Sequence, residues 1–98
     1  RYGGEEFMVL LPMIKEQSMI VAQRIINSVR SYKFISADGE DFQVTASGGV
    51  SIFPIYAKNV KEIVGSVDKA MYKAKSDGKD RVIFYGDMVK NEGEEDVE

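Results

Sequence analysis

At 98 residues the chain is long enough for one small domain, and it contains no cysteine and no histidine. Disulfide frameworks, zinc sites built on thiolate or imidazole, and nucleophilic catalysis that relies on histidine are therefore excluded. The net charge of −3 is uneven, because residues 87–98 hold six acids and one base whereas residues 1–86 hold 10 acids and 12 bases.

The apolar residues of the first third of the chain predict a strand followed by a helix. Residues 7–11 are a continuous apolar run that ends at Pro12, which is typical of a buried strand. From about residue 16 to residue 32 the apolar residues recur at helical spacing. The predicted apolar face of this helix consists of Val21, Ala22, Ile25, Ile26 and Val29.

A second strand and a second helix are predicted after a turn at Asp38 and Gly39. Residues 42–53 are expected to form one long strand, kinked at its glycine pair. Asn59 can cap the second helix at its start, and Gly78 is placed to end it. The predicted buried stripe of this helix consists of Val60, Ile63, Val64, Val67, Met71 and Ala74.

A short apolar segment at residues 81–85 predicts a last strand, so the expected order is strand, helix, strand, helix, strand. This order predicts an α/β fold in which both helices pack on one sheet. We expect residues 1–86 to form the folded part and residues 87–98 to be an acidic, disordered tail. A three-stranded sheet would leave the apolar strand at residues 7–11 uncovered, which predicts self-association or a further segment that covers it.

The sequence Gly3-Gly4-Glu5-Glu6 is the first candidate for chemistry. Paired glycines allow a tight turn and a close approach of a ligand to the backbone. Two carboxylates after such a turn can hold a hard cation such as Mg²⁺, which often brings phosphates with it. A hairpin turn with two solvated acids explains the same residues, and it is the more common explanation for these four residues alone.

A cluster of bases is the second candidate. Within residues 69–81 it consists of Lys69, Lys73, Lys75, Lys79 and Arg81. Lys75 and Lys79 flank the expected end of the second helix, where their charges favour the helix dipole. They can also serve as two point charges for triphosphate oxygens. The dipole is the more common explanation for lysines at such a position.

Three segments together resemble the GGDEF family, the diguanylate cyclase domain. Residues 1–7, RYGGEEF, are similar to the family signature in its GGEEF form. Residues 44–50, VTASGGV, are similar to the central strand TxSxGV, and residues 68–82, DKAMYKAKSDGKDRV, are similar to ADxALYxAKxxGRNxV. The resemblance implies a truncated GGDEF domain of the α+β type, with the palm-like, ferredoxin-like sheet of nucleotide cyclases and helices packed on it.

The resemblance implies that the parent protein condenses two GTP molecules into cyclic di-GMP and pyrophosphate for bacterial second-messenger signalling. The partner would be a second GGDEF domain in a homodimer, and the cofactor Mg²⁺ or Mn²⁺. By the same resemblance, Gly3 and Gly4 would line the GTP site. Glu5 would bind metal and help to deprotonate the attacking hydroxyl, and Glu6 would support the metal.

The resemblance further implies that Lys75 and Lys79 contact the GTP phosphates. Arginine is common in the family where Lys79 stands, so a forked guanidinium is replaced here by a point charge. No segment of the chain corresponds to the N-terminal half of the family domain, which supplies an aspartate metal ligand and the residues that read guanine. We therefore expect the 98-residue chain by itself to be inactive.

Two other classes of function stay open at this point. A non-catalytic GGDEF domain would bind GTP or cyclic di-GMP without turnover, as a nucleotide receptor or signalling scaffold. A protein-interaction module with an acidic tail would show no Mg²⁺-dependent GTP binding. We expect no nucleic-acid partner, a cytoplasmic location, and contact with a membrane only through other parts of the parent, since no apolar run approaches the length of a span.

Overall fold

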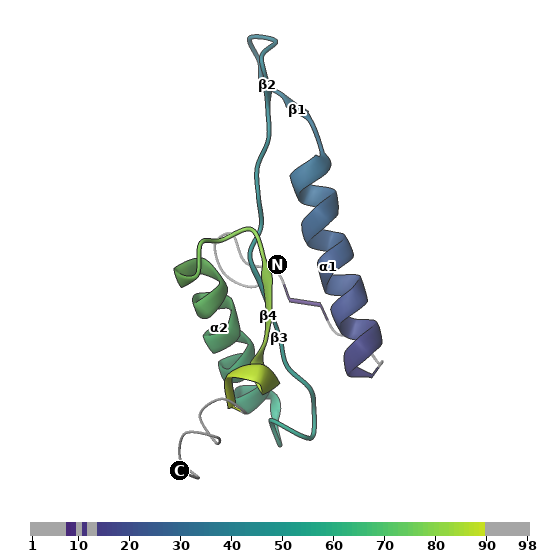
Figure 1. The fold of residues 1–98 in the computed structure, drawn as a ribbon, viewed down its shortest axis with the longest axis vertical. Coiled ribbons are helices and arrows are strands. Elements are labelled where there is room, and N and C mark those ends of the chain that lie inside the picture. The colour runs from purple at the N-terminus through teal and green to yellow at the C-terminus, as the bar shows by residue number, and fades with distance from the viewer. Residues whose placement is uncertain (1–7, 10, 12–13, 90–98) are drawn as a thin grey trace.

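The computed structural model describes residues 8, 9, 11 and 14–89, and within these residues the chain forms two long helices and four short strands (Figure 1). The elements in chain order are α1 (Lys15–Ser31), β1 (Phe34–Ile35), β2 (Asp41–Phe42), β3 (Gly48–Val50), α2 (Val60–Ser76) and β4 (Val82–Phe84). A short helical segment follows at residues 85–89. Neither of the long helices in this part of the chain is long and apolar enough to cross a bilayer. The mixed helix-and-strand class is confirmed.

A β-α-β unit made of β3, α2 and β4 is the centre of the fold. β3 and β4 are parallel neighbours, which requires a long crossover between them, and α2 is that crossover. The paired residues are Gly48 with Val82, Gly49 with Ile83, and Val50 with Phe84. α2 lies on one side of the strand pair and α1 on the other (Figure 1).

α2 begins where the sequence predicts. The side chain of Asn59 accepts a hydrogen bond from the backbone N–H of Glu62 at 2.9 Å, and Glu62 Oε1 accepts one from the backbone N–H of Lys58 at 2.8 Å. This reciprocal arrangement satisfies backbone donors that a helix start leaves free. The predicted N-cap at Asn59 is confirmed.

The buried stripe of α2 is largely as predicted, with one error. Ala74 is completely buried, and so is Ala70. The middle of the predicted stripe is half-buried at Ile63, Val64, Val67 and Met71. Val60 is 77% exposed, because it lies in the first turn at the end of the helix, so its predicted burial is wrong.

Gly49 allows β3 to pack directly on the backbone of α2. A methyl group placed on Gly49 would lie 2.4 Å from the carbonyl oxygen of Val67, 2.6 Å from the backbone nitrogen of Met71 and 2.9 Å from Cβ of Ala70. Real contacts of this kind are never so short, and two of the three neighbours are backbone atoms that cannot rotate away. The glycine is therefore a packing requirement at the centre of the fold.

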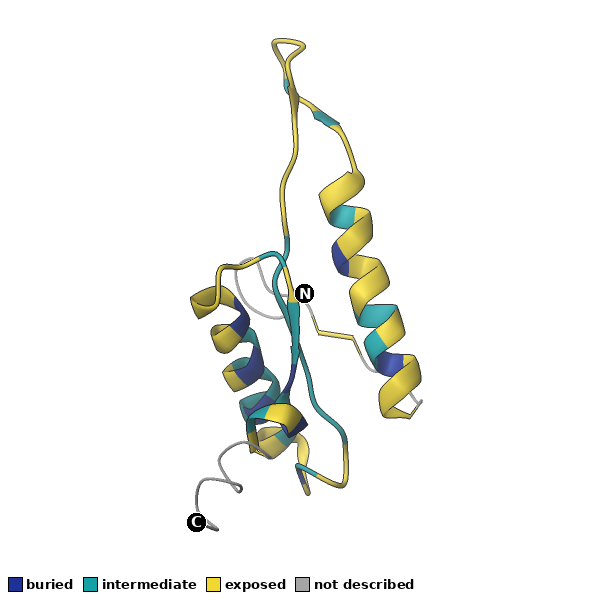
Figure 2. Cartoon of the chain, viewed as in Figure 1, coloured by how far each residue is buried: buried dark blue, intermediate teal, exposed yellow. Residues whose placement is uncertain are grey.

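α1 is confirmed close to its predicted bounds, but the fold covers only part of its apolar face. Ile26 is 4% exposed, whereas its neighbour Ile25 is 45% exposed. Figure 2 shows buried and half-buried residues on α1 interrupted by wide exposed stretches. The predicted burial is correct for Ile26 and wrong for Ile25, because the narrow β3–β4 pair covers a narrow strip of the helix.

The single long strand predicted at residues 42–53 is wrong. β2 and β3 are separate, residues 43–47 belong to no strand, and the glycine pair lies inside β3 instead of forming a kink. β2 pairs antiparallel with β1, which the sequence did not predict, and the hairpin projects from the body of the molecule (Figure 1). Stacking of Phe34 on Phe42, with ring centroids 5.4 Å apart, supports this local pairing.

The hairpin turn is confirmed at Asp38 and Gly39. Gly39 has φ of +85°, which suits a residue without Cβ. The Ser36 hydroxyl donates a hydrogen bond to the Asp38 carboxylate, and this bond is the main reason why the pKa of Asp38 lies below its usual value.

The predicted strand at residues 7–11 is wrong at the positions that the structure describes. Met8 and Val9 lie in no strand and are 46% and 61% exposed, while Phe7 and Leu10 lie outside the described residues. An apolar strand of this kind needs neighbours, and within the described residues β3 and β4 pair only with each other.

The division between a folded part and an acidic tail at residue 86 stays a prediction, since residues 90–98 are outside the described part.

We predict that Gly49→Ala destabilises the domain by about 3 kcal/mol, because the added methyl group must push β3 away from α2. The measurement is the urea dependence of hydrogen exchange in α2, made on the full-length protein. Gly65→Ala is the matched control, since a methyl group there meets no atom within 4 Å and alanine favours the helix interior. Equal stability of the two variants would contradict the close packing.

Candidate functional site

The structure describes only part of the site that the sequence predicts. Gly3, Gly4, Glu5 and Glu6 lie outside the described residues, so their roles stay predictions. Lys75 and Lys79 are described: Lys75 lies in the last turn of α2, and Lys79 lies in the loop at residues 77–81 that leads to β4.

The loop after α2 has an unusual backbone that keeps Lys79 close to the helix end. Gly78, Lys79 and Asp80 have φ of +122°, +66° and +52°, so three consecutive residues have positive φ, which residues with Cβ rarely adopt. A left-handed conformation costs a residue with Cβ roughly 1–2 kcal/mol, although aspartate tolerates it better than most. The backbone N–H of Lys79 donates to the carbonyl oxygen of Ala74 at 2.9 Å, which ties the backbone of Lys79 to the last turn of α2, where Lys75 lies.

Within the described part of the chain, the two lysines differ from Lys73 in their charged neighbours. Lys73 pairs with Asp77 at 3.1 Å, whereas Lys75 and Lys79 are exposed and have no ion-pair partner among the residues that the structure describes. A helix C-terminus favours cations, so the dipole explanation remains valid. Two lysines without ion-pair partners in the described part of the chain, one in the last turn of α2 and one in the loop after it, also suit an anion with several oxygens.

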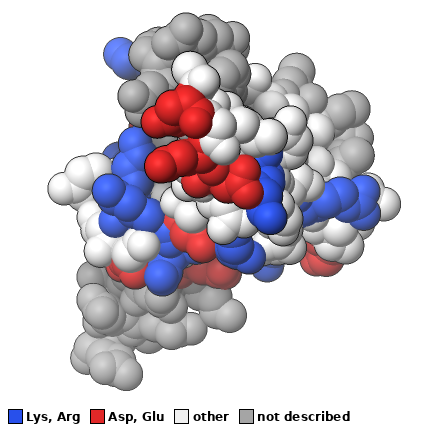
Figure 3. All heavy atoms as spheres, turned by 90° about the horizontal axis from the view of Figure 1, so that it is seen from above, with Lys and Arg blue, Asp and Glu red and all other residues white. Residues whose placement is uncertain are grey.

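Acidic side chains gather elsewhere. Figure 3, which looks down on the hairpin end of the molecule, shows Asp and Glu side chains together near the middle of the view and Lys and Arg side chains around them. Within the described residues, no group of three or more acidic side chains could hold a metal ion.

Side chains to which the sequence analysis gave no such role hold the loop in place. Arg30 Nε donates to both carboxylate oxygens of Asp80, at 3.0 and 2.9 Å, and the backbone N–H of Asp80 donates to Ser47 Oγ at 3.2 Å. Arg81 Nε donates to the carbonyl oxygen of Lys79 at 3.0 Å. The sequence held one signal for the ion pair between Arg30 and Asp80, because an aspartate stands at position 80 where the family pattern GRNxV has asparagine.

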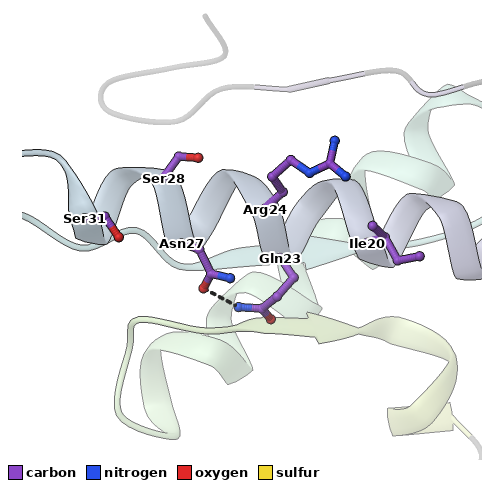
Figure 4. A pocket seen from close by; sticks show the side chains of 6 residues that line it. All are labelled: Ile20, Gln23, Arg24, Asn27, Ser28 and Ser31. Atoms are coloured by element: carbon purple, nitrogen blue, oxygen red, sulfur yellow. Dashed lines mark hydrogen bonds between the residues drawn. The ribbon is translucent and has the colours of Figure 1, made fainter.

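A shallow hollow lies on α1 and contains none of the sequence-predicted site residues (Figure 4). It is lined by Ile20, Gln23, Arg24, Asn27, Ser28 and Ser31. Within it, Gln23 Nε2 donates to Asn27 Oδ1 at 3.1 Å. The lining residues all come from one helix, so the hollow is open and has no opposite wall among them.

Comparisons with known proteins agree on one family. The family model described as "Diguanylate cyclase, GGDEF domain" matches residues 1–81. Diguanylate cyclase A of Treponema denticola is 45% identical over 83 residues, which are 84% of this chain and 22% of that protein. Probable diguanylate cyclase DgcE of Escherichia coli K12 is 36% identical over 86 residues, which are 87% of this chain and 8% of that protein.

The uncharacterized protein YhcK of Bacillus subtilis is also similar, at 34% identity over 85 residues, which are 86% of this chain and 24% of that protein. The chain thus spans less than a quarter of the length of each of these relatives.

We predict that Gly78→Ala loosens the loop after α2 at a cost of about 1–3 kcal/mol. Alanine disfavours φ of +122°, and its methyl group would lie 2.9 Å from a guanidinium nitrogen of Arg81. Hydrogen exchange of residues 77–81 should accelerate. Gly39→Ala is the control, because it places similar strain in the hairpin turn and should leave exchange in residues 77–81 unchanged. Faster exchange there in both variants would contradict a local effect.

Proposed function

The chain belongs to the GGDEF family of diguanylate cyclase domains, and from this membership we propose that the protein condenses two GTP molecules into cyclic di-GMP. The family match over residues 1–81 and relatives named diguanylate cyclases support the proposal. The structural observation that supports it is the pair of exposed lysines, Lys75 and Lys79, at the end of α2, which have no ion-pair partner among the described residues.

In the proposed reaction, two GGDEF domains face each other and each presents one GTP. The 3′-hydroxyl oxygen of each nucleotide forms a bond to the α-phosphorus of the other. The bond between that phosphorus and the oxygen bridging to the β-phosphate breaks, and pyrophosphate leaves. The protein contributes by holding the attacking hydroxyl and the α-phosphate of the other nucleotide in line. Two GTP molecules in solution would rarely meet in this orientation.

The proposed role of Lys75 and Lys79 is to neutralise phosphate oxygens of GTP. Their charges would act more strongly in a closed complex than in water, because bound nucleotide and a second domain would exclude solvent. Gly3 and Gly4 would let the nucleotide approach the backbone. Glu5 would receive the proton of the attacking hydroxyl.

Mg²⁺ or Mn²⁺ is part of the proposal, and Glu5 and Glu6 would hold it. Carboxylate oxygens are the donors that these hard cations prefer, so the two side chains fit the ion chemically. When bound, the ion supplies positive charge that neutralises the phosphates as negative charge moves to the leaving group.

A nucleotide receptor on the same fold is the second candidate, and Lys79 is the observation that favours it. A lysine presents one point charge where a family arginine would present a fork, so the phosphate would be held less firmly. Such a protein would bind GTP or cyclic di-GMP and turn over neither. For either function we propose a cytoplasmic location, where GTP is available.

We predict that the full-length protein forms cyclic di-GMP from GTP and Mg²⁺, and that Glu5→Gln abolishes this activity. The substitution keeps the size of the side chain and removes the charge that holds the cation and accepts the proton. The measurement is product formation by chromatography. Glu16→Gln is the control, because it makes the same change at an exposed position in the first turn of α1. Tight nucleotide binding without any product would favour the receptor.

We predict that the 98-residue chain alone makes no cyclic di-GMP and self-associates. The physical reason for association is that large apolar side chains such as Val9 and Ile14 are 61% and 63% exposed, and association would remove them from water. Product assays and sedimentation of the same preparation test both statements. Detectable product, or a monodisperse monomer at high concentration, would contradict them.

A further inference from the structure

We propose that the ion pair between Arg30 and Asp80 fixes the loop that presents Lys79, so that Arg30 acts as a positioning residue for a bound nucleotide phosphate. Arg30 lies at the end of α1, 50 positions before Asp80. The consequence for GTP rests on the proposed function, whereas the effect on the loop does not. The two parts are therefore tested by separate measurements.

The loop needs an external restraint because its conformation is not one that its residues favour. Lys79 has φ of +66°, and a lysine gains nothing locally from this conformation. Its side chain makes no ion pair within the described part of the chain that could hold it there. Strain of this kind persists only where the surroundings impose it. For Lys79 the restraint comes from the next residue, Asp80, through its hydrogen bonds to Arg30 and Ser47.

Arg30 is itself held in position along α1. Its Nη1 donates to Asn27 Oδ1 at 3.1 Å. The same oxygen accepts from Gln23 Nε2 at 3.1 Å, as Figure 4 shows. Nε of Arg30 is then left facing both carboxylate oxygens of Asp80, at 3.0 and 2.9 Å. Hydrogen bonds thus link Gln23, Asn27 and Arg30 along α1 and continue to Asp80 in the loop. The bond to Asn27 orients the Arg30 guanidinium toward the Asp80 carboxylate.

The loop is tied to β3 on its other side. The backbone N–H of Asp80 donates to Ser47 Oγ, and the backbone N–H of Gly48 donates to the carbonyl oxygen of Arg81 at 2.9 Å. Asp80 therefore joins α1, the start of β3 and the loop, through its side chain and its backbone. Lys79 lies immediately before it, so the direction in which its side chain leaves the backbone is set by these contacts.

A fixed backbone matters because a flexible lysine must otherwise be ordered when it binds an anion. Pre-organising the residue removes part of that entropic cost and raises affinity without adding a contact. Both partners of the pair are partly exposed, at 46% for Arg30 and 34% for Asp80, so the effect is modest. Exposed pairs of this kind change equilibria by about two- to five-fold.

The first test measures hydrogen exchange of residues 77–82 by mass spectrometry, on the full-length protein with Arg30→Gln, with Asp80→Asn and with both changes. Exchange should accelerate about two- to five-fold in each single variant, and the double variant should be no faster than the faster single one. Asp77→Asn is the matched control, because Asp77 lies at the start of the same loop and the substitution breaks its ion pair with Lys73. The two side chains of that pair are similarly exposed, at 46% for Lys73 and 37% for Asp77.

Unchanged exchange in Arg30→Gln would overturn the proposal, as would equal acceleration in Asp77→Asn. Arg30→Lys keeps the positive charge and should restore part of the protection. Because Arg30 is partly exposed on the surface of α1, these variants are expected to fold.

The second test measures GTP turnover by the same proteins. KM for GTP should rise about two- to five-fold in Arg30→Gln, while kcat changes less, because ground-state binding of the phosphates is weakened. An unchanged KM with accelerated exchange would overturn the positioning role. No turnover by the unsubstituted protein would overturn the phosphate part together with the proposed function, and the exchange data would still decide whether the pair fixes the loop.

Discussion

Direct contact between the backbones of β3 and α2 is the constraint on which the rest of the structure depends. Gly49 is small enough to let the strand lie against the helix, and Ala70, which is completely buried, lies next to it on the helix side. Because α2 also connects β3 to β4, this contact fixes where the helix ends and where β4 begins. The loop at residues 77–81 is therefore built at the edge of the unit where both strands start, next to the end of α1.

The site inherits its rigidity from this arrangement. Lys79 belongs to a short loop, yet its backbone is bonded to α2, its carbonyl oxygen to Arg81, and the following residue to both α1 and the start of β3. Three elements that are distant in sequence thus meet at one strained turn. Strain at an exposed loop is expected where a side chain must be presented in one direction, and the phosphate-binding role proposed for the two lysines would need such a direction.

The helices were predictable because the forces that form them are local. Apolar spacing, the Asn59 cap and the terminal glycine at residue 78 all act within a few positions of each other, and both helices occur within a residue or two of the predicted bounds. The strands were less predictable, since pairing is decided by distant partners. Residues 42–53 have the composition of one strand, but β2 pairs with β1 and β3 with β4, so the run is divided between two partners.

The sequence by itself determined the family, because three of its segments resemble the family motifs in the same order. It also determined the two helices and the positions of Lys75 and Lys79. Only the tertiary structure decided that these lysines have no ion-pair partners in the described part of the chain, and that Arg30 and Ser47 hold the loop that carries Lys79. The physical reason is that an ion pair across 50 positions depends on how α1 packs beside β3, and no local pattern in the sequence records that packing.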